Sequence, residues 1–203
     1  MASDQLGFDG LFQQAETANR RYRLERDSGH LPNELEAAIR LHRQQIRQHD
    51  AAMRVLDRAA AEAINKDAHL MAVRVNHGDP GILASRDSPG CIISTRCAAR
   101  SGKVPLWGQA GRFTITVAGV PVLIAMDGMF GICGGSVPGF SAHVVDQDQP
   151  FISETGYRSF LGCRVELVPG MTPGDYAQQA VAGHVAGEMK GKLRPIDARF
   201  RRS

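Results

Sequence analysis

The chain has 203 residues, 43% of them hydrophobic, and a formal net charge of +3, which suits one domain with an appendage or two small domains. No stretch approaches the roughly 18 consecutive apolar residues of a membrane-spanning helix, so the sequence predicts no such span. The positive excess lies in the last 33 residues, which hold six basic and three acidic residues, whereas a dedicated nucleic-acid-binding protein shows a broader basic footprint.

The cellular compartment is predicted from the N-terminus and the cysteines. Residues 1–10, MASDQLGFDG, lack the basic and apolar regions of a secretion signal. The four cysteines have irregular spacings that do not suit a disulfide framework. These features predict a cytoplasmic protein. The sequence contains no C-x2-C or H-x3-H pair, no Walker loop and no dinucleotide fingerprint, so it predicts no metal and no cofactor.

The first third of the chain is predicted to be a helical hairpin. Its first helix carries tolerant or apolar residues three or four apart, namely Phe8, Leu11, Ala15, Ala18 and Tyr22. Its second helix is predicted over residues 32–64 and carries a heptad seam typical of coiled coils. The seam consists of Leu35, Ile39, His42, Ile46, His49, Met53, Leu56, Ala60 and Ala63. Residues 26–32, RDSGHLP, predict the connecting loop.

The two predicted helices differ in length, and the difference predicts an interaction surface. About 20 residues span roughly 30 Å and about 33 residues span roughly 50 Å, at about 1.5 Å per residue. The far end of the second helix must therefore pack on the rest of the chain or on another subunit. The predicted interaction residues are Met53, Leu56, Ala60, Ala63, Ile64, His42 and His49. The two histidines either form a pH-responsive or metal-bridging interface or set the register of the seam.

After Asp67 the pattern changes to short strands, which predicts an antiparallel sheet, sandwich or half-barrel. Residues 112–126, RFTITVAGVPVLIAM, predict a hairpin that turns at Ala118 and Gly119. The shorter strand candidates are HLMAVRVN (69–76), GCIIST (90–95), MFGIC (129–133), SAHVV (141–145) and PFIS (150–153).

A tight turn is predicted at SETG, residues 153–156, with Gly156 in a left-handed conformation. In the strand that follows, Tyr157, Ser159 and Leu161 share a largely apolar face, and the opposite face carries charges such as Arg158. The apolar face is predicted to be buried. Glu154 and Arg158 are interpreted either as a working pair or as solvated charges beside the turn.

Residues 171–203 are predicted to form a C-terminal helix and a basic tail. Thr172 is the expected cap, Pro173 the first helical residue, and Asp175 follows three residues after the cap. The predicted apolar stripe consists of Tyr176, Ala180, Val181, His184, Val185 and Met189. The predicted units are therefore residues 1–67, 68–170 and 171–203.

Nucleic-acid binding is one alternative function. It would use two arginine-rich segments, in which the candidate residues are Arg20, Arg21, Arg23, Arg26, Arg199, Arg201 and Arg202. Arginine is also favoured near a helix C-terminus because of the helix dipole, and a terminal basic segment is often disordered.

A cysteine-dependent enzyme is a second alternative. The segment GICGG, residues 131–135, has the G-x-C-x-G form of a nucleophile elbow, with Cys133 as nucleophile and His143 as base. The elbow requires a helix directly after the nucleophile, and Pro138 and Gly139 oppose one. A buried cysteine in a glycine-rich bend is the structural alternative.

The segment SETGYRSFLG, residues 153–162, together with the glycine-containing C-terminal helix, resembles small accessory proteins carried on bacterial plasmids and integrative elements. The resemblance implies a bacterial cytoplasmic protein that acts on host machinery, for example as an inhibitor of host defence. It assigns no role to any residue.

The sequence as a whole predicts an α+β fold, with a coiled-coil-like N-terminal helical hairpin, an antiparallel β domain and a C-terminal helix. The predicted function is non-enzymatic: binding of a protein partner or of a second copy, as a homodimer, through the exposed helical seam.

Overall fold

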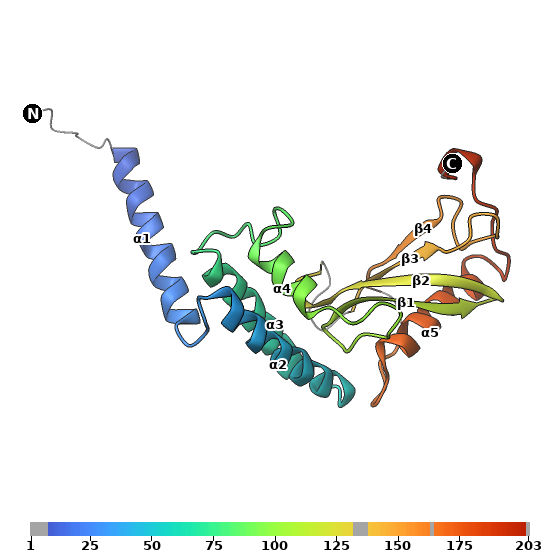
Figure 1. Cartoon of the computed structure of the whole chain (residues 1–203), viewed down its shortest axis with the longest axis horizontal. Coiled ribbons are helices and arrows are strands. Elements are labelled where there is room, and N and C mark those ends of the chain that lie inside the picture. The colour runs from blue at the N-terminus through green and yellow to red at the C-terminus, as the bar shows by residue number, and fades with distance from the viewer. Residues whose placement is uncertain (1–7, 132–137, 163–164, 202–203) are drawn as a thin grey trace, which may run out of the picture.

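The computed structural model describes residues 8–131, 138–162 and 165–201 and shows an α+β fold, which confirms the predicted fold class (Figure 1). The helices are α1 (Phe8–Ser28), α2 (Leu35–Arg54), α3 (Arg58–Val75), α4 (Pro89–Cys97) and α5 (Pro173–Gly187). The strands are β1 (Ala110–Val117), β2 (Val120–Asp127), β3 (Phe140–Val144) and β4 (Tyr157–Phe160). Helices α2–α4 lie at one end of the sheet, and α5 lies along one of its faces (Figure 1).

The predicted second helix is in fact two helices, because the chain reverses direction at residues 55–57. Leu56 adopts a left-handed conformation with φ of 61°, and its N–H donates to the Met53 carbonyl at 3.1 Å. The Asp57 carboxylate then accepts from the Ala60 N–H at 3.0 Å and caps α3. The hairpin is therefore formed by α2 and α3. The predicted pairing of residues 8–28 with one long helix is wrong.

Helix α1 is attached to the body through its C-terminal turns. Arg74 of α3 donates to both carboxylate oxygens of Glu25, at 2.9 and 3.2 Å. Ser28 is fully buried, and its hydroxyl donates to the Leu24 carbonyl at 2.6 Å. Residues 11–19 are all exposed, so the first half of α1 projects from the molecule (Figure 1).

Two segments predicted as strands are helical. Residues 69–75 continue α3 and Asn76 is its C-cap; the buried residues Ala68, Met71 and Val75 recur at helical spacing and pack against α2. Residues 90–95 lie in α4, which begins after Ser88 with Pro89 in its first turn. Their β-branched and apolar residues resemble a strand locally, but the partner surface is another helix, and tertiary packing overrides the weak local preference.

The sheet is antiparallel, with strand order β1-β2-β3-β4. The predicted hairpin is confirmed: Ala118 and Gly119, with φ of 51° and 79°, form the turn between β1 and β2. The candidate at 141–145 corresponds to β3. The candidate at 129–133 begins in a 3-10 helix (Gly128–Phe130) and continues outside the described residues, and the one at 150–153 forms only a bridge between Phe151 and Arg194.

The SETG turn is confirmed. In the strand after it, however, the face that was predicted to be buried, that of Tyr157, is the exposed one. Gly156 has φ of 71°, and its N–H donates to the Ser153 carbonyl at 3.3 Å. Phe160 is buried, with its ring stacked on Phe140 at 4.8 Å, whereas Tyr157 is 49% exposed. The cross-strand pairing of Phe160 with Phe140 directs this face toward α5 and turns the Tyr157 face outward.

Helix α5 begins as predicted, with a capping box between Thr172 and Asp175. Its predicted apolar stripe is buried against the sheet. Trp107 joins this core to α2: its backbone N–H donates to Asp50 at 3.0 Å, and its indole N–H donates to the Met171 carbonyl at 2.8 Å. The predicted boundary at residue 67 lies inside α3, and α5 shares one core with the sheet across the boundary at 170.

A membrane-crossing helix would need greater length and apolarity than any helix in the described residues has.

Candidate interaction surfaces

The predicted seam belongs to the protein's own interior. His42, Ile46, His49 and Met53 are buried on α2, and Met53 packs in the same cluster as Trp107. After the break, Leu56, Ala60 and Ile64 are half-buried and Ala63 is exposed. The seam is therefore covered largely by the chain itself. The unequal lengths of the two predicted helices do not leave it open as an interaction surface.

The two seam histidines are core residues. The His42 ring stacks on Phe130 at 5.0 Å, and its Nδ1 lies 3.3 Å from Oε1 of Gln45. Burial lowers the pKa of His42 to about 4, so the ring is neutral at pH 7. Burial also lowers the pKa of His49, whose ring fits closely against Gly108. In the described residues, no group of three or more His, Cys, Asp or Glu side chains is placed to hold a metal ion.

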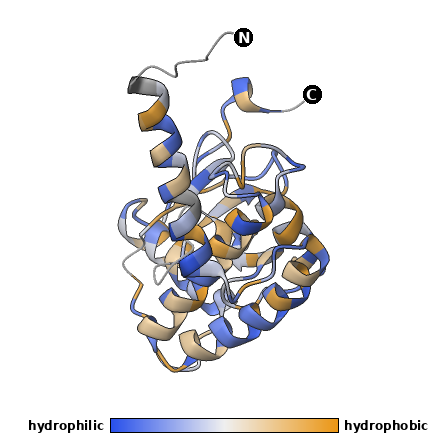
Figure 2. Ribbon diagram, turned by 90° about the vertical axis from the view of Figure 1, so that its left-hand side faces the viewer, coloured by the Kyte–Doolittle hydropathy of each residue, from blue (hydrophilic) through white to orange (hydrophobic). Residues whose placement is uncertain are grey.

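Helix α1 exposes the stripe that was predicted to pair with the second helix. Leu11 and Tyr22 are 56% and 69% exposed, and Ala15 and Ala18 between them are also exposed. Their spacing of four, three and four residues places them on one side of the helix. Figure 2, in which α1 faces the viewer, shows apolar and polar segments alternating along it. We call Leu11, Ala15, Ala18 and Tyr22 the α1 stripe.

The predicted basic residues are distributed over two distant places. Helix α1 and the C-terminal segment lie toward opposite ends of the molecule (Figure 1). In α1, Arg26 pairs with Asp27 at 2.8 Å, and Arg23 is exposed. The side chains of Arg20 and Arg21, and all of Arg202, lie outside the described part of the chain.

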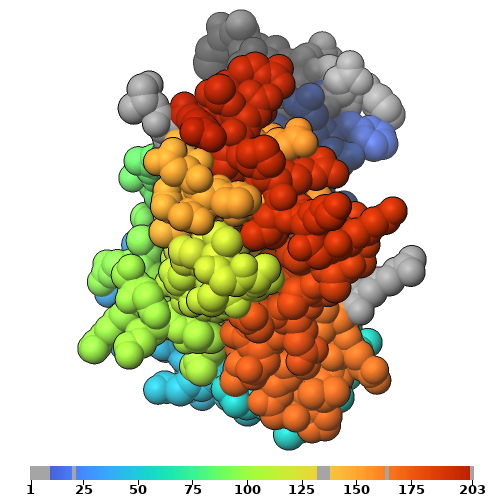
Figure 3. All heavy atoms as spheres, turned by 90° about the vertical axis from the view of Figure 1, so that its right-hand side faces the viewer, coloured from blue at the N-terminus to red at the C-terminus, as the bar shows by residue number. Residues whose placement is uncertain are grey.

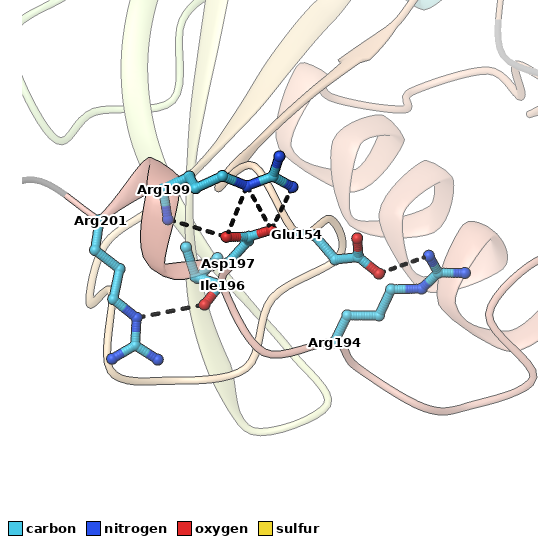
Figure 4. Close-up of polar contacts among 6 residues, drawn as sticks. All are labelled: Glu154, Arg194, Ile196, Asp197, Arg199 and Arg201. Atoms are coloured by element: carbon cyan, nitrogen blue, oxygen red, sulfur yellow. Dashed lines mark hydrogen bonds and ion pairs between the residues drawn. The ribbon is translucent and has the colours of Figure 1, made fainter.

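Arg199 and Arg201, in the described part of the C-terminal segment, pair with carboxylates. Arg199 bonds Asp197 at 2.7 Å, and Arg201 donates to the Ile196 carbonyl at 3.3 Å (Figure 4). Arg201 also pairs with Asp148 at 3.4 Å. The hydrogen bonds from Arg199 lower the pKa of Asp197, so the pair persists at neutral pH. Figure 3 shows the C-terminal segment, in red, on the surface at the sheet end of the molecule.

Glu154 and Arg158 do not act as a pair. Glu154 bonds Arg194 at 3.1 Å (Figure 4), whereas Arg158 bonds Glu188 at 3.0 Å beyond the end of α5. Both contacts join the SETG turn and β4 to the C-terminal segment, which is a structural role.

Of the two residues of the predicted cysteine-dependent enzyme, only His143 lies in the described part of the chain. Cys133 lies outside the described residues. Nε2 of His143 is 2.9 Å from the Ser141 hydroxyl, and its ring meets Tyr157 edge-on at 5.1 Å. Burial and, to a smaller extent, Arg112 lower the pKa of His143, while Asp127 raises it.

The outward face of the sheet carries six polar or aromatic side chains together with Leu123 and the buried Ala125, and the sequence did not predict them as one group. The strand register aligns them in two rows across all four strands. We call these eight residues the open face: Arg112, Ala125, Ser141 and Ser159 in one row, and Thr114, Leu123, His143 and Tyr157 in the other. A groove of about 1010 Å³ runs between this face and α4, lined in part by Arg96, Arg112 and Asp127.

The sequence contains an alternation of polar and apolar residues that indicates the open face. In β1 the polar residues Arg112 and Thr114 alternate with the buried residues Phe113 and Val117, which is typical of a sheet with one wet side. The same alternation occurs at Ser141 and His143 of β3. Only His143 among the eight was predicted as a site residue.

Comparison with known proteins finds a similarity that covers the sheet and α5. Residues 110–190 match the family model for the third domain of KlcB. The matched segment runs from the first residue of β1 to just beyond α5, which is the unit that shares one core. Two Escherichia coli proteins named Protein KlcB are each 35% identical to the chain, over 157 and 119 residues. No solved structure matches.

The KlcB relatives are much longer than this chain. The two alignments cover 75% and 59% of the chain but only 36% and 24% of the respective relatives. The similarities support a plasmid-associated family of bacterial accessory proteins, in partial agreement with the predicted resemblance.

Proposed function

We propose that the protein is a non-enzymatic interaction protein that pairs with a second copy through the α1 stripe. The observation that carries this proposal is the exposure of Leu11, Ala15, Ala18 and Tyr22 on a helix that is attached to the body through Glu25. Apolar residues at this spacing form the contact seam of helix pairs. The similarity to KlcB is compatible with such a role, and action on host defence stays a prediction from the resemblance.

A second copy suits the stripe because α1 is self-complementary in charge. Its first half carries Asp9 and Glu16, whereas residues 19–28 carry four arginines against two acidic residues. In an antiparallel pair related by a two-fold axis near the middle of the stripe, the Asp9 end of each helix lies opposite the arginine-rich half of its copy. The same arrangement places the two bodies at opposite ends of the helix pair, where they do not collide. Ala15 lies near the middle of the stripe and would meet its own copy at the axis.

A charge-swap experiment tests this pairing. At micromolar concentration, light scattering should give the mass of a dimer for the wild-type protein. Ala15→Glu and Ala15→Lys should each be monomeric, because two like charges meet at the axis, and an equal mixture of the two variants should recover the dimer. Glutamate and lysine are good helix formers, so α1 itself should persist.

Gln13→Glu is the control, because Gln13 lies on the other side of α1 and the change adds the same carboxylate. It should leave the mass unchanged. A monomeric wild-type protein, or two Ala15 variants that stay dimeric, would overturn the proposal.

A further inference from the structure

The open face has a basic side and an aromatic side. The basic side lies next to β1, where residues 98–103 run along the outer edge of the strand: Ala99 N–H donates to the Ala110 carbonyl at 2.8 Å, and Gly102 N–H donates to the Arg112 carbonyl at 3.0 Å. This loop places additional cations beside Arg112. The basic margin consists of Arg96, Arg100, Lys103 and Arg112, all exposed.

The basic margin is only partly neutralised. Arg96 pairs with Glu36 at 3.2 Å, whereas Arg100, Lys103 and Arg112 pair with no carboxylate in the described residues. Asp127, at the end of β2, is the acidic residue that lines the groove beside Arg112. The margin therefore has an excess of positive charge, which attracts a polyanion.

The aromatic side lies on β3 and β4. Tyr157 is 49% exposed, and its ring is oriented by a T-shaped contact with His143 at 5.1 Å, so about half of the side chain is accessible for stacking. The hydroxyls of Thr114, Ser141 and Ser159 lie on the same face of the sheet. They are donors and acceptors of the kind that contact bases and sugars.

From these features we infer that the open face binds single-stranded nucleic acid, with phosphates at the basic margin and bases stacked on the Tyr157 side. Four strands at about 4.8 Å spacing span roughly 14 Å, the width of the four-stranded RNA-binding sheets on which aromatic side chains stack bases, and Tyr157 is such a platform here. A single strand fits better than a duplex, because stacking on Tyr157 requires a base whose face is free. This inference is independent of the pairing through α1.

Fluorescence anisotropy with a labelled 20-nucleotide single strand at 50 to 200 mM salt tests the inference. Binding should weaken with salt, and Arg112→Gln should reduce the slope of log K against log salt by about 0.7, the contribution of one phosphate contact to a single strand. Tyr157→Ala should weaken binding roughly 5- to 100-fold, the usual effect of losing one stacking platform. Tyr157→Phe, which keeps the ring, should bind like the wild-type protein.

The C-terminal segment provides a matched control. Arg199→Gln/Phe200→Ala removes one arginine and one aromatic ring that is 47% exposed, from one of the two arginine-rich segments predicted as nucleic-acid candidates. This double variant should bind within about twofold of the wild-type protein, whereas Arg112→Gln/Tyr157→Ala should lose binding. All four residues are exposed, and circular dichroism checks that both variants are folded.

Several results would overturn the inference. They are no binding at 50 mM salt, equal loss in both double variants, a 20-bp duplex bound as tightly as the single strand, or binding to anionic phosphatidylserine vesicles in place of nucleic acid.

Discussion

Tyr176→Ala is expected to lower the free energy of unfolding by about 3–5 kcal/mol, the range for deleting a large aromatic side chain from a core. Tyr176 is 1% exposed on α5, with its ring edge-on to Trp107 at 5.7 Å and to Phe140 at 6.0 Å. Its hydroxyl donates to the Pro138 carbonyl at 3.1 Å. Alanine leaves a cavity where α5, the sheet and the Trp107 segment meet. Urea denaturation followed by circular dichroism measures the loss.

Two tyrosine variants separate the causes of this loss. Tyr176→Phe removes only the hydroxyl and should cost about 1 kcal/mol, the net value of one hydrogen bond. Tyr157→Ala, on the open face, should change the free energy of unfolding by less than about 0.5 kcal/mol, because its side chain is half exposed. A Tyr176→Ala variant that loses less than Tyr176→Phe would contradict the packing of α5 described above.

The free energy of unfolding should also fall on acidification because of His42. Its pKa is about 4 in the folded chain and about 6.5 when unfolded, so between these values only the unfolded state takes up a proton. Stability is therefore complete above pH 6.5 and decreases as pH falls toward 4. Between pH 7 and pH 5 the expected loss from His42 is about 2 kcal/mol, at about 1.4 kcal/mol per pH unit.

His42→Leu isolates this contribution, because leucine keeps an apolar side chain beside Phe130 but does not titrate. Urea midpoints at pH 7 and pH 5 should differ less in His42→Leu than in the wild-type protein. Ile46→Val is the control: Ile46 is buried on the same helix and has no titratable group, so this variant should leave the pH dependence unchanged. Equal pH dependence in the wild-type protein and in His42→Leu would show that His42 is not buried as a neutral ring.

The proposed surfaces were only partly predictable from the sequence. The sequence showed the regular spacing of Leu11, Ala15, Ala18 and Tyr22. It did not show that these residues are exposed, because their exposure depends on where the second helix turns. For the open face, the alternation along β4 separated Tyr157 from Phe160 correctly. Which of the two faces would be buried depended on the pairing of Phe160 with Phe140, two residues that are 20 positions apart in the sequence.

Local sequence alone determined the features whose physical cause lies within a few residues. These are the α1 and α5 helices, the Thr172–Asp175 cap, the Ala118–Gly119 hairpin and the left-handed Gly156, because caps and tight turns are set by neighbouring side chains and by allowed φ values. Tertiary structure decided the rest. The heptad spacing continued across Leu56, where the helix in fact ends, and residues 69–76 had the composition of a strand, although they belong to the end of a helix. In both places the conformation depends on which apolar surface is available to bury the side chains. Burial is a property of the assembled chain, so the α2–α3 reversal, the neutral core histidines and the outward side of the sheet followed only from the fold.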